Sequence, residues 1–399
     1  MLRLNAVYGW VLLVLVGVAA VVVATVARPE VRRRSLGTGF PGEVITIPLT
    51  AAPFSTNYDM YINLLYWNTA GQAQSLSLLC DSGNNTLIMP YFEQLDPAKY
   101  VVRGTTYEPW GCPCNIVEGQ ILIPTQNNEY WYGDMVFLAC TGPPDPAFVT
   151  APRPRTPQVT LGTGSGIRTY NFGLGTGSFG TDVLVKAPLA YLPYEYTEIL
   201  MNAAGPSSIV QTVASLARPA GYSQDFPARS GTILNLVSAS QSPDQGFRID
   251  TQATAYADCG GQAPSDNSVL FDTGGGISYL TDPNGCLATK LATQPTVDCG
   301  SLGAACPGTT CYSMNGLEVQ VSGDGTAANG SYTVQYPLGH TLAVVPTSCR
   351  YAVWGATQPG MNVGGSTFAE AVDMLITYKT NALAFRPKTT GQRAQGLFP

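Results

Sequence analysis

Two stretches of this chain repeat one pattern, in which an aspartate stands between an apolar run and a turn. Residues 78–90 read LLCDSGNNTLIMP, with Asp81 before Ser-Gly, and residues 269–280 read VLFDTGGGISYL, with Asp272 before Thr-Gly. The two aspartates are 191 residues apart, which is too far for a solenoid repeat and close to the length of one domain. The repeat therefore predicts two similar lobes that each present one carboxyl group.

The composition favours strands over helices. Of the 399 residues, 45% are hydrophobic and 12% are charged, so the chain can bury a large core in more than one domain. The 43 glycines and 30 prolines indicate many turns, and the apolar runs are short and rich in Val, Ile, Leu and Tyr. The net charge of −6 gives no electrostatic case for a nucleic-acid partner. We expect an all-β-dominated fold with a few short helices.

Several apolar runs have the length and alternation of strands. A β-meander is predicted from GEVITIPL through YDMYINLLYW to SLSLLC, where it leads into Asp81. The segment EGQILIPTQNNEYWYGDMVFLACT predicts a hairpin that pairs residues 120–123 with 134–139 around a TQNN tip. Near the C-terminus we expect a short helical turn, a strand, a polar turn at 379–381 and a closing strand.

The best helix candidate is SSIVQTVASLARPAG, residues 207–221. Its apolar positions lie on one side of a helix, and a proline would end it: Ile209, Val210, Val213, Leu216 and Pro219. Further upstream, the glycines of LGTGSGIRTYNFGLGTGSFGTD match GxGxxG, but no alternating strand and helix pattern surrounds them. We interpret that segment as turns between short strands, and we expect no nucleotide or other cofactor.

Ten cysteines form an even set, which favours disulfides in an oxidising compartment. The segment from Cys286 to Cys311 contains several Gly and Pro residues, which predicts a loop insertion that is cross-linked by disulfides. A zinc site that uses the CPC sequence with Cys140 is not favoured, because the single histidine is His340 and no spaced cysteine pair accompanies it. We expect no metal. The cysteines are Cys80, Cys112, Cys114, Cys140, Cys259, Cys286, Cys299, Cys306, Cys311 and Cys349.

The N-terminal segment, residues 1–34, carries an uncharged run from Tyr8 to Ala27 that is long enough to span a bilayer. We expect it to remain as a signal anchor or to be cleaved as a signal peptide after Ala24 or Ala27. The arginines after this run would favour a cytosolic position for the rest of the chain. The cysteines and the Asn329-Gly-Ser sequon favour the lumenal or extracellular side instead.

Two matched carboxyl groups can perform chemistry that one cannot. If the lobes pack about a pseudo-twofold axis, the loops of Asp81 and Asp272 meet at a cleft, and two carboxyls about 3 Å apart cannot both ionise. They share a proton and titrate as a pair, with a water held between them. The ionised member takes a proton from the water as it attacks a carbonyl, and the protonated member donates to the carbonyl oxygen. The Gly of each loop allows a tight turn that brings N–H groups near the carboxylates.

These segments, in this order, resemble the pepsin-type aspartic proteases over residues 40–387. YDMYINLLYWNTAGQAQSLSLLCDSGNNTLIMP is similar to the strand block that ends in the family's first Asp-Thr-Gly loop, and VLFDTGGGISYLTDP to its second loop. YNFGLGTGS resembles the family's Asp-Gly-Ile-Leu-Gly-Leu-Gly segment, and MNVGGSTFAEAVDMLITYKTNALAF its closing stretch. The resemblance implies a bilobal β fold with a central cleft, and it implies that Asp81 and Asp272 are the catalytic pair within the loops Ser82-Gly83-Asn84 and Thr273-Gly274-Gly275.

Departures from the family pattern concern both loops and the flap. The family has Ser or Thr after each Asp-Thr/Ser-Gly, where the hydroxyl binds the neighbouring carboxylate, whereas this chain has Asn84 and Gly275. The Asn84 amide could donate in place of the hydroxyl, but Gly275 has no side chain. In the flap region, TYEPWGCPCNIVEG, Trp110 and then Tyr107 are the candidates for the family's flap tyrosine, and the alternative is that both are ordinary loop aromatics.

We therefore predict a membrane-anchored or secreted aspartic endopeptidase, with an N-terminal lobe at 35–228 and a C-terminal lobe at 229–399. Its partner would be an extended polypeptide substrate, and we expect a monomer. The alternative is a catalytically weak or inactive relative that binds a protein or glycan in its cleft, which the changed positions 84 and 275 support. A structural surface protein without a cleft is the third possibility.

Overall fold

The computed structural model describes residues 42–51, 60–90, 92–108, 112–126, 130–142, 158–160, 167–179, 185–202, 205–240, 248–250, 268–275, 277–282, 285–299, 307–315, 318–335, 338–346, 361–364, 368 and 371–389. The chain divides into two compact units, Met1–Gly39 and Phe40–Pro399, and every described residue belongs to the second. The predicted anchor or signal segment therefore lies outside the described residues. Within the described ranges, no helix is long and apolar enough to span a membrane.

Thirteen strands of the described part of the chain form one continuous sheet. In spatial order they are β13 (Phe226–Pro227), β25 (Ala382–Pro387), β24 (Val372–Thr377), β11 (Tyr196–Leu200), β12 (Ser207–Thr212), β1 (Val44–Ala51), β2 (Met60–Trp67), β3 (Ala73–Asp81), β10 (Asn171–Gly173), β4 (Leu87–Met89), β7 (Tyr130–Cys140), β6 (Pro113–Pro124) and β5 (Tyr100–Tyr107). β1 joins the two halves of this sheet, because residues 44–49 pair with β12 and residues 50–51 pair with β2.

Ten further strands of the described ranges form a second sheet. In order they are β18 (Thr296–Val297), β19 (Thr310–Asn315), β22 (Leu338–Pro346), β17 (Ser278–Asp282), β23 (Met361–Val363), β16 (Ser268–Phe271), β14 (Ile233–Ser240), β20 (Glu318–Ser322) and β21 (Tyr332–Gln335), and β15 (Arg248–Asp250) pairs with β14. β8 (Gln158–Thr160) and β9 (Ile167–Thr169) form a separate pair. The described helical elements include α2 (Cys286–Lys290) and the 3₁₀ turns η1 (Phe92–Gln94), η2 (Pro188–Tyr191) and η4 (Ala327–Asn329), and Phe368 is helical as well.

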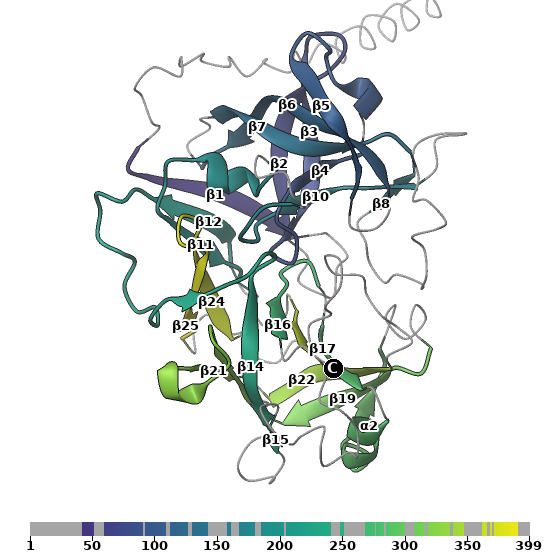
Figure 1. Cartoon of the computed structure of the whole chain (residues 1–399), viewed down its shortest axis with the longest axis vertical. Helices are drawn as coiled ribbons and strands as arrows, with labels where there is room; N and C mark the ends of the chain where they lie inside the picture. Colours follow the sequence, from purple (N-terminus) through teal and green to yellow (C-terminus); the bar gives the residue numbers. More distant parts are fainter. Residues whose placement is uncertain are drawn as a thin grey trace, which may run out of the picture. The chain divides into compact units, whose positions relative to one another are not determined.

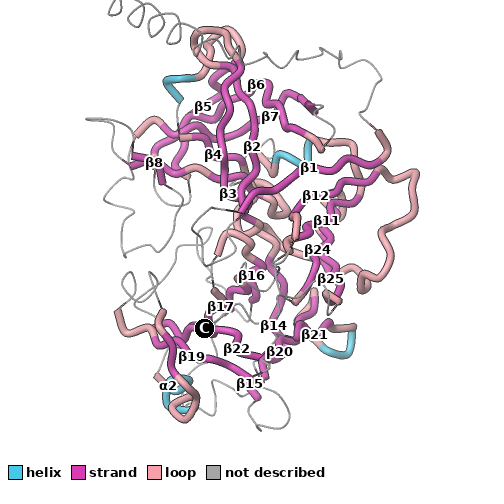
Figure 2. The backbone as a smooth tube through the Cα atoms, turned by 180° about the vertical axis from the view of Figure 1, so that it is seen from behind, coloured by secondary structure: helices cyan, strands magenta, loops and turns pink. Residues whose placement is uncertain are grey.

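The two sheets occupy different parts of the second unit. In Figure 1, the strands from β2 to β7 lie in the upper half and those from β14 to β22 in the lower half, with β11, β12, β24 and β25 between them. Figure 2 shows the same order from behind. β24 and β25 come late in the chain but belong to the first sheet, where β24 pairs with β11 and β25 pairs with β24. The lobe boundary between residues 228 and 229 stays a prediction.

The predicted strands and hairpins are confirmed. β1, β2 and β3 form the meander into Asp81, and β24 and β25 form the closing hairpin around residues 378–381. In the β6–β7 hairpin, Gln120 pairs with Asp134 and the pairing continues to Pro124 opposite Tyr130. The predicted hairpin is thus present, but residues 120–123 pair with 131–134, and residues 134–139 pair with 115–120, so the predicted pairing of 120–123 with 134–139 is wrong.

The predicted helix at 207–221 is wrong, because the segment begins with strand β12. β12 pairs with β1 on one side and β11 on the other, so its backbone groups are satisfied by neighbouring strands. Its burial alternates from Ser207 to Val210, which is the two-residue period of a strand. Ile209, Val210 and Thr212 are β-branched and suit that position. Of the apolar positions that suggested a helix, only Ile209 and Val210 lie within β12, which is too few to distinguish the two periods.

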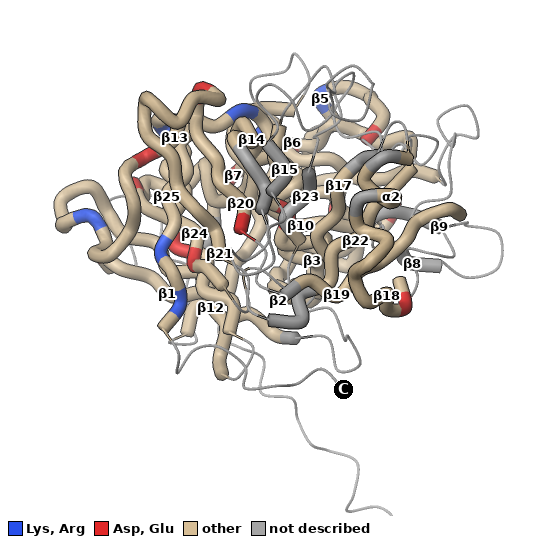
Figure 3. Tube along the Cα trace, turned by 90° about the horizontal axis from the view of Figure 1, so that it is seen from below, with Lys and Arg blue, Asp and Glu red and all other residues tan. Residues whose placement is uncertain are grey.

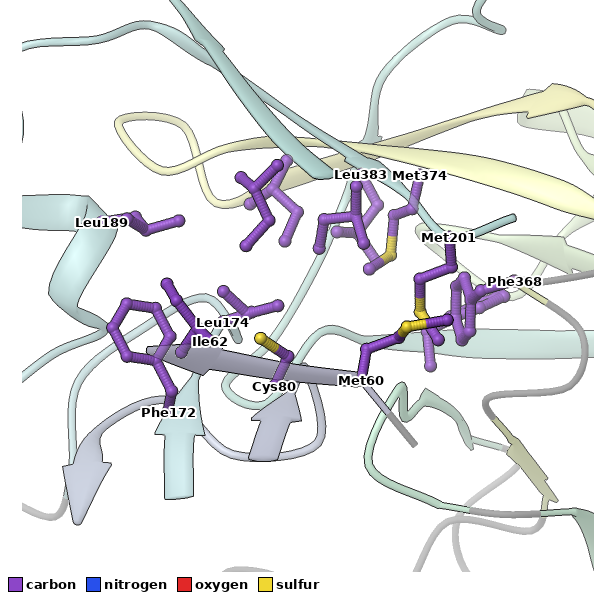
Figure 4. Close-up of a cluster of buried hydrophobic side chains, with 14 of the residues drawn as sticks. Met60, Ile62, Cys80, Phe172, Leu174, Leu189, Met201, Phe368, Met374 and Leu383 are labelled. Atoms are coloured by element: carbon purple, nitrogen blue, oxygen red, sulfur yellow. The ribbon is translucent and has the colours of Figure 1, made fainter. Parts of the chain in front are cut away.

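The cysteines only partly form the expected disulfides. Cys299 and Cys311 are bonded to each other, which confirms a staple within the 286–311 segment. Cys80 is instead a buried thiol, and Figure 4 shows its sulfur within an apolar cluster that includes Met60, Ile62 and Leu174. Its side chain thus serves the core, while the next residue, Asp81, carries the carboxyl group. Cys259, Cys306 and Cys349 lie outside the described residues.

Charged residues are few along the tube of Figure 3, and several of them gather around β24 and β25. Asp373 is almost fully buried and binds two cations, with Lys388 Nζ at 2.5 Å from Oδ1 and Arg386 Nη2 at 2.8 Å from Oδ2. The Lys388 side chain is itself fully buried, and burial lowers its pKa. This ion-pair cluster fixes the end of β25 against β24.

Candidate active site

Both predicted aspartates lie at the ends of strands that have matching surroundings. Asp81 is the last residue of β3, and Asp272 directly follows β16. Each of these strands pairs in parallel with a three-residue strand: Cys80 lies opposite Phe172 of β10, and Phe271 lies opposite Val363 of β23. The two sheets thus present their Asp loops in the same local frame, as the repeat in the sequence predicted.

The residues that follow the two aspartates bind each other across the sheets. The Ser82 N–H donates to Thr273 Oγ1 at 3.0 Å, and the Thr273 N–H donates to Ser82 Oγ at 3.0 Å. The hydroxyls then donate onward, Ser82 to the Phe271 carbonyl at 2.5 Å and Thr273 to the Cys80 carbonyl at 2.9 Å. Since both side chains are buried, this reciprocal set holds the two loops at a fixed separation.

The glycines of the two loops give the carboxyls their backbone donors. The Gly83 N–H donates to Asp81 Oδ1 at 2.7 Å, and the Gly274 N–H donates to Asp272 Oδ1 at 3.0 Å. A Cβ atom at Gly83 would lie 2.9 Å from Asp272 Cγ, and one at Gly274 would lie 2.7 Å from Asp81 Cγ. The N–H bonds agree with the role that the sequence suggested for these glycines. The structure adds that each glycine permits the opposite carboxyl to approach.

The carboxyl groups of Asp81 and Asp272 are hydrogen-bonded to each other. Asp81 is buried, with 6% of its surface exposed, whereas Asp272 is half-buried. Burial raises the pKa of Asp81 well above its usual value, and the neighbouring Asp272 charge raises it further. Hydrogen bonds from Asn171 and Gly83 act in the opposite direction. Asp81 is therefore the member of the pair that keeps a shared proton.

The side-chain amide of Asn84 does not donate a hydrogen bond to the Asp81 carboxyl, although the sequence suggested that it could. Its Oδ1 accepts a hydrogen bond from the Thr86 N–H at 3.1 Å, and among the described residues its buried Nδ2 has no hydrogen-bond partner. The donor to Asp81 is instead Asn171, whose Nδ2 lies 2.5 Å from Asp81 Oδ2. Asn84 turns toward its own loop, so an asparagine 90 residues away supplies the bond.

The remaining candidates have different outcomes. The Gly275 N–H donates to the Asp272 carbonyl at 3.2 Å, as the Asn84 N–H does to the Asp81 carbonyl at 3.4 Å, so the two turns match in their backbone. Tyr107 ends β5 opposite Pro113 with 44% of its surface exposed, and its role as a flap residue stays a prediction. Trp110 lies outside the described residues.

Two residues of the site were missed by the sequence reasoning. Thr232 is fully buried, and its Oγ1 lies 2.8 Å from the carbonyl oxygens of both Ser82 and Phe271, so it ties the two loops together from a third segment. Its φ of 53° is strained for a β-branched residue. Asn171 could have been found, because Asn-x-Gly occurs at 171–173 and again at 362–364.

Among the described residues, no group of three or more His, Cys, Asp or Glu side chains is placed to hold a metal ion. What the arrangement can do is hold one proton between two carboxyls and polarise a molecule placed against them.

No protein-family model matches the sequence, and a search of curated proteins finds no match. Among solved structures, the chain is similar to the crystal structure of basic 7S globulin from soybean, with 12% sequence identity and a TM-score of 0.52 over 89% of this chain and 99% of that one. The fold is pepsin-like. The predicted fold class, all-β-dominated with two large sheets, is thereby confirmed. At this identity the pepsin-like likeness concerns the fold alone, and the globulin's name states no catalytic activity.

Proposed function

We propose that this protein is an aspartic endopeptidase that cleaves extended polypeptides with Asp81 and Asp272. The observation that carries the proposal is the hydrogen-bonded carboxyl pair, held between two loops that match in strand pairing, backbone donors and glycine contacts. Two carboxyls in contact oppose each other's ionisation, so a structural role alone gives no reason to keep both.

In this mechanism the pair holds one proton, on Asp81, and a water lies between the two carboxyls. Asp272 takes a proton from the water, whose oxygen bonds to the peptide carbonyl carbon, while Asp81 gives its proton to the carbonyl oxygen. The resulting tetrahedral diol collapses when a proton passes to the amide nitrogen and the C–N bond breaks. No covalent enzyme intermediate forms. An extended substrate suits a site lined by strands, where backbone hydrogen bonds supply affinity.

The second candidate is a pepsin-like protein that binds a protein or glycan without cutting it. The turn of Asn84 away from Asp81 and the missing side chain at Gly275 favour it, because both changes alter the surroundings of the carboxyls. It predicts a complex that forms whether or not Asp272 can ionise.

We also propose that the protein is secreted or lumenal, and that the segment from Tyr8 to Ala27 is its membrane anchor or its cleaved signal. The Cys299–Cys311 disulfide supports an oxidising compartment. Asn329 of the sequon is exposed in a surface turn, where a glycan can be accommodated.

The test is cleavage of a denatured protein mixture between about pH 3 and 7. The wild type, Asp272→Asn and a matched control, Asp134→Asn, are compared with and without a transition-state-mimicking inhibitor of aspartic proteases. Asp134 is exposed on β7, so its change alters the same chemistry outside the site. We expect acid-dependent cleavage in the wild type and control, at least about a thousandfold less in Asp272→Asn, and inhibition. Absence of cleavage by well-folded wild type at every pH would refute the proposal.

A further inference from the structure

The hydrogen bond from Asn171 to Asp81 selects one oxygen of the carboxyl. Asn171 Nδ2 donates to Oδ2 at 2.5 Å, and both side chains are buried. The other oxygen, Oδ1, receives the Gly83 N–H. Each oxygen of the Asp81 carboxyl thus accepts one N–H donor, so these two bonds alone do not decide which oxygen carries the shared proton. The position of the partner carboxyl decides it.

Oδ1 is also the oxygen that faces the partner carboxyl. A Cβ atom built on Gly83 would lie 2.9 Å from Asp272 Oδ1 and 3.0 Å from Asp81 Oδ1, so both Oδ1 atoms border the same point. A Cβ atom on Gly274 would lie 3.0 Å from Asp81 Oδ1. Asn171 thus holds the oxygen that is turned away from the partner and leaves the inner oxygen for the proton.

The second sheet repeats this arrangement in its backbone register. Residues 171–173 are Asn-Phe-Gly and residues 362–364 are Asn-Val-Gly. Phe172 lies opposite Cys80, and Val363 lies opposite Phe271, so in both sheets the residue after the asparagine pairs with the residue before the aspartate. Asn362 therefore has the register position relative to Asp272 that Asn171 has relative to Asp81.

The glycines of the two Asn-x-Gly segments, Gly173 and Gly364, also have matching positions relative to the two Asp loops. A Cβ atom on Gly173 would lie 2.3 Å from Thr86 N and 2.7 Å from Asn84 O. One on Gly364 would lie 2.6 Å from Ile277 O and 3.0 Å from Gly275 O. These contacts involve the third and fifth residues after each aspartate, so both Asn-x-Gly segments approach their loops in the same way.

We infer that Asn171 is a positioning residue, which orients the Asp81 carboxyl so that the shared proton lies between the two inner oxygens. The inference rests on the proposed function, which it deepens. The other titratable groups close to Asp81 are Asp272 and the Cys80 thiol, and the Tyr378 hydroxyl is close to Cys80. Neither Cys80 nor Tyr378 changes in the variants below, so shifts between variants report on the asparagines.

The test compares Asn171→Leu with a control, Asn85→Leu, in the full chain. Asn85 is equally buried, and its amide has no hydrogen-bond partner among the described residues, so the control makes the same change at an amide that binds neither carboxyl. Two readouts are used: the pH dependence of kcat and KM, and the pH titration of ¹³C-labelled aspartate carboxyls by NMR. Asp81→Asn and Asp272→Asn assign the NMR signals of the pair.

The Asn171→Leu variant should move the upper limb of the pH profile. A bond donated to a carboxylate favours ionisation, so its loss raises the pKa of the pair by about one pH unit. The upper value, at which Asp81 loses the shared proton, should therefore rise. The kcat of this variant should fall between about tenfold and a hundredfold while its KM changes little. Asn85→Leu should change neither readout.

The outcomes separate this inference from the proposed function. Raised NMR pKa values in a protein that cleaves nothing would support the positioning role and refute the protease. Cleavage by wild type, with unchanged pKa values in folded Asn171→Leu, would overturn the inference. If Asn171→Leu does not fold, Asn171→Asp replaces it, because a protonated Asp donates the same bond. We then expect activity near pH 3 that is lost as the added acid ionises, and a profile identical to wild type would overturn the inference.

Discussion

Replacing Thr273 by valine tests whether the reciprocal hydrogen bonds hold the two Asp loops together. Valine has nearly the same size, so the change removes only the hydroxyl. Thr273 is 1% exposed, and its Oγ1 donates to the Cys80 carbonyl and accepts from the Ser82 N–H. Each of these two buried backbone groups would lose its bond, at a cost of about 1–3 kcal/mol each. We therefore expect the free energy of unfolding to fall by about 2–5 kcal/mol.

The assay is urea unfolding followed by the fluorescence of the five tryptophans. Thr50→Val is the matched control, because Thr50 is exposed on β1 and its hydroxyl bonds the Tyr61 carbonyl at 3.3 Å. It should change stability by less than about 0.5 kcal/mol. Combining Thr273→Val with Ser82→Ala should give a non-additive result, with a coupling of about 1 kcal/mol or more. A loss below about 1 kcal/mol in Thr273→Val, or strict additivity, would refute the reasoning.

Two further changes test charges. Burial gives folded Asp81 a pKa above the ordinary 3.8, so the folded protein keeps a proton that the unfolded chain releases above about pH 4, and this contribution to stability falls as pH rises. Asp81→Asn should therefore raise the melting temperature relative to wild type more at pH 7 than at pH 3.5, and an equal difference by calorimetry at both would contradict this. Asp373→Ala should lower the free energy of unfolding by about 3–5 kcal/mol, because it leaves the buried Lys388 without its carboxylate. Adding Lys388→Met should restore most of that loss in the same denaturant assay, whereas no restoration would show that the buried charge is not the cause.

The parts of the fold that could be predicted are those in which neighbouring residues carry the signal. The alternation in β2 and the turn after β6 lie within single short segments, so local periodicity was sufficient. The failure at β12 has the opposite cause. Its short apolar run does not distinguish a helix from a strand. The choice is made by pairing with β1, which lies far away in the sequence, and with β11, which lies just before it.

In the candidate site, too, the features set by neighbouring residues could be predicted and those set by distant residues could not. Asp81, Asp272 and their glycines were found because the motif occurs twice along the chain. The partner of Asp81 was expected at Asn84, three residues away, but a tight turn points that side chain into its own loop. Asn171 lies on β10, and only the parallel pairing of β10 with β3 brings it to the carboxyl. The contact between Asn171 and Asp81 could not be predicted because the two residues are far apart in the sequence. The repeated Asn-x-Gly segment was the one available signal.

The position of β24 has a consequence for how the chain is made. During synthesis, β11 and β12 leave the ribosome long before β24, which pairs with β11, and β25, which pairs with β24 and extends the sheet. Until then, the edge of β11 that β24 covers is unpaired, which is the kind of surface that invites wrong pairing between chains. The first sheet is therefore complete only after residue 387 has been translated. Truncation before residue 372 should leave a product that chaperones retain, even though both aspartates are present.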